Sequence, residues 1–221
     1  MSIFITSSVS KEAISYCKST HPSLHYPSTL TCIKAPARAS VTYSLREGYS
    51  ANHDAESEYS GFPNEANNNA WEDLIYPMFF NATASEILKA GSSPEDSVLL
   101  AEGGYISALG VYHELHCLRR IRLFLYAPVY YPTMTPANLD YVQKHLDHCL
   151  ETLRISLMCT ADLSLYNFRW HAADDDRPQP ETHGRRKCAN WESVDTWART
   201  RRLDYDPVLV RTTGKKERVQ L

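Results

Sequence analysis

The chain lacks any apolar run of the roughly 18–20 residues that a membrane-spanning helix requires. Its opening, Met1-Ser2-Ile3-Phe4-Ile5-Thr6, is too short and becomes polar too soon for the apolar core of a secretory signal peptide. The sequence by itself therefore predicts a soluble protein without a targeting segment.

An excess of charge of either sign is also missing. The chain has 23 basic and 26 acidic residues, which gives a formal net charge of -3. This balance excludes the basic footprint of a nucleic-acid-binding protein and the polybasic patch of a membrane-surface protein. The sequence also contains no glycine-rich phosphate loop and no repeat of solenoid length.

What the chain has is the composition of a folded protein. Its 221 residues are 43% hydrophobic and 22% charged, as expected for one globular domain with a substantial core. We divide it into an irregular N-terminal segment (1–45), a single domain (46–202) and a solvated C-terminal tail (203–221).

The spacing of apolar residues favours helices over most of this domain. We expect helices over about 69–77, 85–90, 107–126, 137–158 and 191–201, with residues 106–112 equally compatible with a strand. Thr135-Pro136 suits the start of the fourth of these helices. In the third, Arg119, Arg120 and Arg122 supply the outer face. The expected fold is mainly α: a compact helical domain in which two long helices pack antiparallel, with a few short strands and long loops.

The most informative feature is a five-residue pattern, His-x-x-His-Cys, that occurs twice. The copies are His113-Glu114-Leu115-His116-Cys117 and His145-Leu146-Asp147-His148-Cys149. Residues three and four apart share a helix face, so each copy presents two imidazoles and a sulfur in one direction. A single copy would be typical of solvated or hydrogen-bonded histidines. Two identical copies on consecutive helices favour a metal site.

Imidazole ligands suit zinc, copper, iron and nickel, and a neighbouring thiolate favours zinc or copper. Structural zinc sites usually combine two to four cysteines, which makes a site dominated by histidine less typical of them. Glu114 and Asp147 each directly precede or follow a histidine and point about 100° away from it, so neither is a good fellow ligand.

The cysteines of the motif leave two interpretations open. Cys117 and Cys149 are either metal ligands or a disulfide that bridges the two helices beside the metal. The separation of their Cα atoms, which the sequence does not give, decides between them. Cys159 and Cys188 are better candidates for an ordinary structural disulfide.

The doubled motif and its surroundings resemble the UstYa-type proteins of fungal secondary metabolism. The resemblance covers roughly residues 45–200. Its further positions are Ala70-Trp71-Glu72-Asp73-Leu74, Gly103-Gly104-Tyr105, the run from His113 to Leu118, Leu150, Leu153-Arg154, Met158-Cys159-Thr160-Ala161-Asp162, Cys188 and Trp197.

This resemblance implies an oxidative tailoring enzyme that acts on a peptide or small-molecule natural product by cyclisation, hydroxylation or halogenation. It also implies one or two copper ions, with O2 as oxidant. The implied copper ligands are His113, His116, His145 and His148, with Cys117 and Cys149 as further ligands or as an adjoining bridge.

Other expectations also depend on the resemblance. Tyr105 and Tyr112 lie close to the first motif and either line the pocket and take part in catalysis or simply pack in the core. Family members commonly begin with a transmembrane helix before a lumenal domain, so the resemblance implies the membrane or lumen of the secretory pathway. The chain shows no such helix in residues 1–45. A homodimer, or a heterodimer with a family relative, is a further expectation.

Two other functions compete with a copper oxidase. In a non-redox cyclase or isomerase, the histidines would act as acid–base groups. In a non-catalytic partner protein, they would hold structural zinc that stabilises the fold.

Overall fold

The computed structural model describes residues 35–47, 56–170, 176–204, 206–211 and 213–219. Its helices are α2 (Glu65–Ile75), α3 (Ala84–Lys89), α4 (Gly110–Leu125), α5 (Ala127–Tyr130), α6 (Pro136–Thr160) and α7 (Trp191–Arg201), with 3-10 turns η2 (Pro36–Ala39) and η3 (Pro94–Asp96). Its strands are β1 (Tyr43–Arg46), β2 (Phe79–Ala82), β3 (Leu99–Leu100), β4 (Tyr105–Ala108), β5 (Asn167–Arg169), β6 (Gln179–Glu181), β7 (Arg186–Ala189), β8 (Val208–Val210) and β9 (Lys216–Arg218). The predicted irregularity of residues 1–34 lies outside the described residues.

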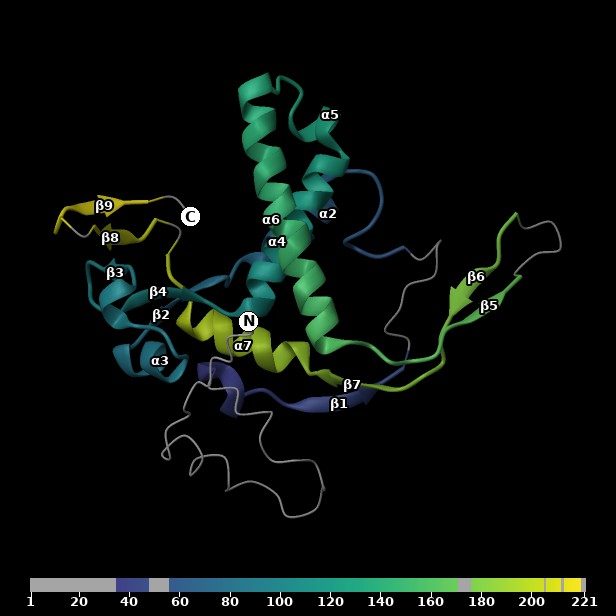
Figure 1. Cartoon of the computed structure of the whole chain (residues 1–221), viewed down its shortest axis with the longest axis horizontal. Coiled ribbons are helices and arrows are strands. Elements are labelled where there is room, and N and C mark those ends of the chain that lie inside the picture. Colours follow the sequence, from purple (N-terminus) through teal and green to yellow (C-terminus); the bar gives the residue numbers. More distant parts are fainter. Residues whose placement is uncertain (1–34, 48–55, 171–175, 205, 212, 220–221) are drawn as a thin grey trace, which may run out of the picture.

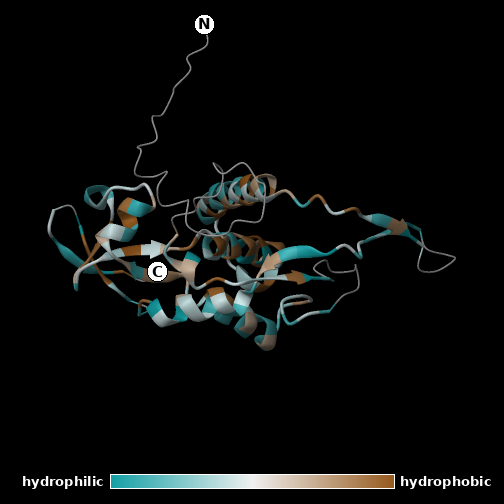
Figure 2. Ribbon diagram, turned by 90° about the horizontal axis from the view of Figure 1, so that it is seen from below, coloured by the Kyte–Doolittle hydropathy of each residue, from teal (hydrophilic) through white to brown (hydrophobic). Residues whose placement is uncertain are grey.

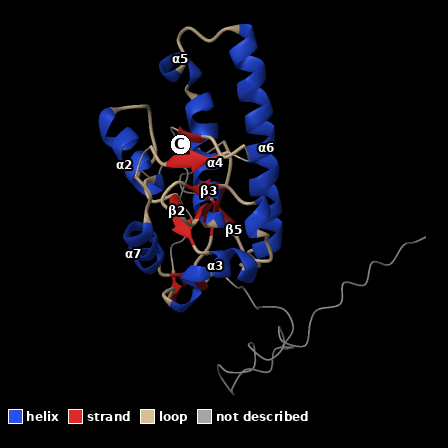
Figure 3. Ribbon diagram, turned by 90° about the vertical axis from the view of Figure 1, so that its left-hand side faces the viewer, coloured by secondary structure: helices blue, strands red, loops and turns tan. Residues whose placement is uncertain are grey.

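Helices α4 and α6 form the central feature of the fold and lie side by side (Figures 1 and 3). Their directions are opposite, since His113 faces His148 while His116, further along α4, faces His145. Helix α6 begins where the sequence predicts, because the Thr135 hydroxyl accepts a hydrogen bond from the Asn138 N–H (3.2 Å) and Pro136 occupies the first turn.

The strands overturn the expected mainly α fold. Strands make up 18% of the described residues and helical segments 47%. Five strands form one sheet in the order β2-β4-β3-β8-β9, and two antiparallel pairs, β1–β7 and β5–β6, stand apart from it. The described chain is therefore a mixed α and β structure. The expectation was wrong because strands of two to four residues are too short to show an alternating pattern.

The C-terminal segment also differs from the predicted solvated tail. Strands β8 and β9 lie within residues 203–221 and form the end of the five-stranded sheet, where Leu99 of β3 pairs with Val210 of β8. Leu203 is buried, and its N–H donates a hydrogen bond to the Phe79 carbonyl (2.9 Å). This hydrogen bond holds the segment that follows α7 against β2.

Two apolar clusters connect the helices to the sheet. In the first, Tyr112 of α4 packs with Met78 and with Val194 and Ala198 of α7. A second cluster joins β2 to α3 through three buried side chains, and Trp197 of α7 packs against both. Helix α7 therefore fixes α4 relative to the sheet.

Helix α2 begins earlier than the predicted residue 69, because a capping box extends it to Glu65. The Asn64 side chain accepts a hydrogen bond from the Asn67 N–H (2.9 Å), and the Asn67 side chain accepts one from the Asn64 N–H (3.0 Å). The amide of Asn67 also donates to Ser60 and Phe62 carbonyls, which explains its burial.

The β5–β6 hairpin extends away from the body of the chain in both Figure 1 and Figure 2. Among the described residues, no helix has the length and apolar character to cross a membrane.

A side chain at Gly104 would collide with the Asn81 side chain. Its φ is +83°, and a Cβ atom there would lie 1.8 Å from the Asn81 side-chain oxygen. We expect Gly104→Ala to lower the free energy of unfolding by about 2–4 kcal/mol, through backbone strain and a steric clash. Gly103→Ala is the matched control: its φ is also positive (+93°), but no atom lies within 4 Å. It should cost only about 1–2 kcal/mol. Equal losses in denaturant unfolding would contradict the clash.

The ion pair between Glu86 and Arg201 makes stability depend on pH. Hydrogen bonding to Arg201 is the main reason that the pKa of Glu86 falls from 4.5 to about 2. Because the pKa is lowered in the folded state, the stabilisation is complete above pH 4.5 and is lost as the pH falls through about 2.

We therefore expect Glu86→Gln to lower the free energy of unfolding by about 1–3 kcal/mol at neutral pH. The deficit should shrink as thermal unfolding is followed down to pH 2, near the folded-state pKa. Glu151→Gln removes an exposed ion pair with Arg154 and should change stability by less than about 1 kcal/mol. A Glu86→Gln deficit that does not vary with pH would contradict this account.

Candidate metal centre

The four motif histidines meet at the interface between α4 and α6. The ring centroids of His113 and His148 are 5.5 Å apart, and those of His116 and His145 are 5.9 Å apart with an angle of 29° between the ring planes. Along α6, the ring centroids of His145 and His148 are 6.4 Å apart. The antiparallel packing thus forms two cross-helix pairs, each with one imidazole from each motif.

These imidazoles face one another but do not converge on one point. No group of three or more His, Cys, Asp or Glu side chains within the described ranges has the arrangement of a formed metal site. The donor set itself suits copper, because neutral imidazoles are common copper ligands and four of them border one interface. The residues therefore fit a metal by their chemistry, although the rings lie in one tilted and one stacked pair rather than in a coordination sphere.

Burial keeps part of this cluster neutral. Desolvation lowers the pKa of His116 to about 4, with the positive charge of Arg120 as the next cause. The same two causes, in the same order, lower the pKa of His145. At neutral pH, His116 therefore has an unprotonated nitrogen whose lone pair is free for a metal or a proton.

The motif cysteines lie behind the histidines as buried thiols. Cys117 and Cys149 have no exposed surface, lie within hydrogen-bonding reach of each other, and are free cysteines. Burial is the main cause that raises the pKa of Cys149, which favours a neutral thiol over the thiolate that metals bind. Of the two interpretations that the sequence left open for this pair, the structure does not form the disulfide.

Cys159 and Cys188 are also free, contrary to the predicted structural bridge. Cys159 is exposed at the end of α6, whereas Cys188 pairs with Ser44 in the β1–β7 ladder.

A cavity of about 600 Å³ adjoins three of the histidines, His113, His116 and His145. This volume is within the range of sites for small molecules. Its other walls come from the end of α2, the start of β2, the third turn of α4 and the segment after α7. The remaining lining residues are Glu72, Ile75, Tyr76, Met78, Phe79, Arg119, Arg120, Arg202, Leu203 and Asp204.

The cavity is richer in arginine than the sequence suggests. Arg119 and Arg120 line it, although their positions predict an outer helix face. Arg119 is paired with Glu72 of α2 (3.0 Å), whereas Arg122 lies away from the cavity and donates a hydrogen bond to the Gly61 carbonyl. A cation therefore stands beside the histidines, close enough for Arg120 to lower two imidazole pKa values.

The two tyrosines singled out by sequence do not line this cavity. Tyr112 is fully buried and its hydroxyl donates a hydrogen bond to Asp195 (3.0 Å), while Tyr105 packs against the cluster around Phe80. Burial raises the pKa of Tyr112 far above its usual range, with the Asp195 hydrogen bond as the second cause. A catalytic role for either residue stays a prediction.

Two other tyrosines lie closer to the histidines. The ring of Tyr141 meets that of His145 edge-on at 6.5 Å, and Tyr76 lines the cavity. Tyr141 could have been found from the sequence, since it precedes His145 by four residues on one helix face. Tyr76 carries no such signal, because it reaches the cavity from the end of α2.

The sequence is similar to a family of fungal biosynthetic proteins. Residues 1–201 match the sequence model of the family described as mycotoxin biosynthesis protein UstYa. The UstYa family oxidase phomYc of Diaporthe leptostromiformis is 30% identical over 188 residues, which cover 78% of this chain and 72% of that protein. No solved structure shows significant similarity.

Two further relatives share less of their length with this chain. The UstYa family oxidase phomYd of Diaporthe leptostromiformis is 32% identical, with 62% of this chain and 44% of that protein covered. A Talaromyces islandicus protein named transacylase cctO is 27% identical, with 77% of this chain and 60% of that protein covered.

The chain belongs to the UstYa family of mycotoxin biosynthesis proteins. Family membership and the names of its oxidase relatives support an oxidoreductase role in the oxidative tailoring of fungal secondary metabolites.

Proposed function

We propose that this protein is a copper-dependent oxidase that modifies a peptide or small-molecule natural product by oxidative cyclisation, hydroxylation or halogenation. The observation that carries the proposal is the meeting of four imidazoles from two antiparallel helices beside a cavity of about 600 Å³.

In this proposal, His113, His116, His145 and His148 hold one or two copper ions. Bound copper would supply one-electron chemistry with dioxygen, which no side chain of the chain can supply alone. The buried contact of Cys117 with Cys149 sets the spacing of α4 and α6 at the level of the motifs. Close packing there leaves the imidazoles in facing pairs.

In this proposal, different residues of the cavity wall bind the substrate and accept a proton. Tyr76, Met78 and Phe79 form an apolar surface against which the body of a substrate can pack and exclude water. His116 is neutral at pH 7 and can accept a proton when it is not bound to metal. Association with a second copy or a family relative stays a prediction.

Redox cycling of the full chain tests this proposal without a known substrate. After loading with copper and removal of excess metal, we expect one or two copper ions per chain by elemental analysis. Their electron paramagnetic resonance signal should disappear with ascorbate and return on exposure to air. A chain that retains zinc but not copper, and unfolds on chelation, would contradict the oxidase and support the zinc-stabilised partner protein.

A non-redox reaction is the second candidate, since neutral His116 borders the cavity and one relative is named a transacylase. It predicts turnover that persists without oxygen and after chelation.

A further inference from the structure

The arginines of the cavity wall are not equivalent, and their difference indicates what the cavity binds. Arg119 is already paired with Glu72 (3.0 Å). Arg120 has no hydrogen bond or ion pair to any residue that the structure describes, although it lines the cavity one position after that ion pair. Its guanidinium is therefore available to a molecule in the cavity.

Arg202 approaches the same cavity from the segment after α7. Its guanidinium lies 4.0 Å from the centre of the Tyr76 ring, and Nη1 donates a hydrogen bond to the Leu203 carbonyl (3.1 Å). These two contacts fix the orientation of the planar group, and its other N–H groups make no hydrogen bond or ion pair to the described part of the chain. Phe80 pairs with Arg202 in an isolated β-bridge, which anchors the backbone at this position.

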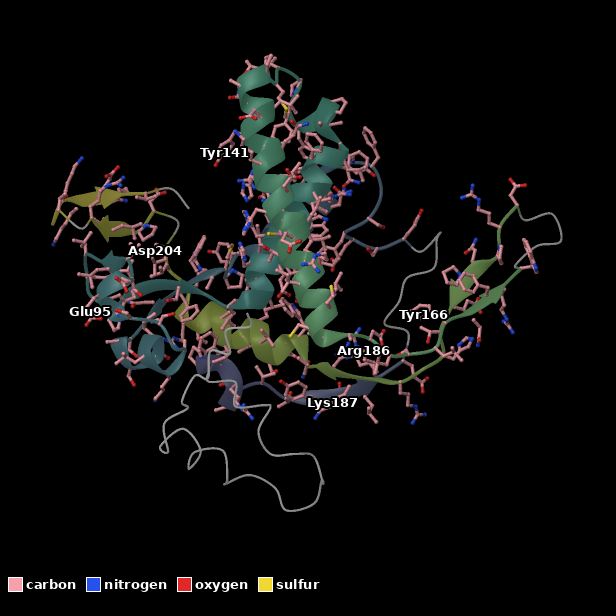
Figure 4. The ribbon with its side chains drawn as sticks, viewed as in Figure 1. Glu95, Tyr141, Tyr166, Arg186, Lys187 and Asp204 are labelled. Carbon is pink, nitrogen blue, oxygen red and sulfur yellow. The ribbon has the colours of Figure 1, made fainter. Side chains whose placement is uncertain are left out.

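The charged and apolar residues that line the cavity both indicate the kind of ligand it binds. Three arginines and two acidic residues, Glu72 and Asp204, line the cavity, so the wall carries an excess of positive charge. Asp204 forms no ion pair with Arg202 among the described residues. Figure 4 shows Asp204 and Tyr141 on the same side of the α4–α6 pair, and the cavity that Asp204 lines is also lined by three motif histidines. Beside the cations stand the apolar side chains of Met78, Phe79 and Leu203.

We propose that this cavity recognises a substrate carboxylate through Arg120 and Arg202, with the apolar body of the substrate against Tyr76 and Phe79. A guanidinium presents parallel N–H donors that match the two oxygens of a carboxylate, and such charge-assisted pairs are stronger than neutral hydrogen bonds. The carboxylate also offsets the positive charge beside the imidazoles. This inference specifies the substrate class of the proposed oxidase and rests on that proposed function for its biological meaning.

The test compares two probes that differ only in charge, N-acetylphenylalanine and its carboxamide. We expect the acid to bind the full chain about tenfold more tightly than the amide in calorimetry or NMR titration. Arg120→Gln and Arg202→Gln should each reduce this preference, and the double variant should abolish it. Arg154→Gln, which removes an exposed arginine on α6, is the matched control and should retain the preference.

The same titrations are repeated on chelator-treated protein and on His113→Ala/His148→Ala. A preference that survives both treatments but not the arginine substitutions supports recognition by arginine, whether or not copper binds. A preference lost on chelation but kept in the arginine variants would assign the carboxylate to the metal and overturn the inference, leaving the proposed function intact. Equal binding of acid and amide, or no binding of the acid at millimolar concentration, would also overturn it.

Discussion

Replacement of His113 and His148 together by alanine is expected to remove bound copper and to reduce ascorbate-driven oxygen consumption by about 100-fold or more. These residues form the closer cross-helix pair, with ring centroids 5.5 Å apart, and one comes from each motif. Neither is fully buried, so their truncation should leave the α4–α6 packing in place. Elemental analysis and an oxygen electrode measure the two effects.

The matched control is His183→Ala. His183 follows β6, its side chain is 82% exposed, and it lies far along the chain from both motifs. This variant should keep both its copper and its oxygen consumption. Wild-type copper content in the double variant, with an unchanged circular dichroism spectrum, would show that the metal is held elsewhere.

Replacement of Tyr112 by alanine should lower the free energy of unfolding by about 3–5 kcal/mol, because a fully buried aromatic side chain would leave a large cavity. Tyr112 packs between α4 and α7 and directly precedes His113. We therefore expect the loss of this ring to disturb the first motif as well as to destabilise the fold. Denaturant unfolding measures the effect.

Tyr112→Phe separates packing from chemistry. It keeps the ring and removes only the hydrogen bond to Asp195, which still accepts one from Arg199 (2.6 Å). The expected cost is about 1–2 kcal/mol, with oxygen consumption per bound copper close to wild type. Tyr141→Phe, beside His145, provides a comparison at the rim of the cluster. A stable, copper-loaded Tyr112→Phe that no longer consumes oxygen would instead support the catalytic role predicted from sequence.

The helices that carry the motifs were predictable because their signals are local. The apolar stripe of α4 and the cap at Thr135 specify helices within a few residues of the observed bounds. The spacing of each motif then places its histidines on one face. The approach of the four imidazoles follows from these local rules and from antiparallel packing of two helices joined by a short connection.

The sheet was not predictable by the same reasoning. Strand β3 has only two residues, and although its neighbour β4 follows it closely, its other neighbour β8 lies near the C-terminal end of the described chain. Such strands depend on long-range pairing rather than on their own pattern. For this reason the sequence predicted a solvated tail at residues 208–210, which in the structure form β8 and pair with β3.

Only part of the cavity lining could be predicted from the sequence. Its histidines were found from the motif, whereas Tyr76 and Arg202 reach it from the ends of α2 and α7. The bridge between Phe80 and Arg202 and the Leu203–Phe79 hydrogen bond hold the segment after α7 beside β2, and neither has a local sequence signal. The sequence also left the state of Cys117 and Cys149 open, because it gives neither their separation nor their burial.

X-ray absorption at the copper edge of the loaded full chain tests the central claim most directly. The account predicts a first shell with imidazole nitrogens from the motif histidines and no sulfur, because Cys117 and Cys149 are buried thiols outside the cavity. The imidazole signal should be lost in His113→Ala/His148→Ala. A copper–sulfur shell, or a shell without imidazole, would contradict the proposed centre between α4 and α6.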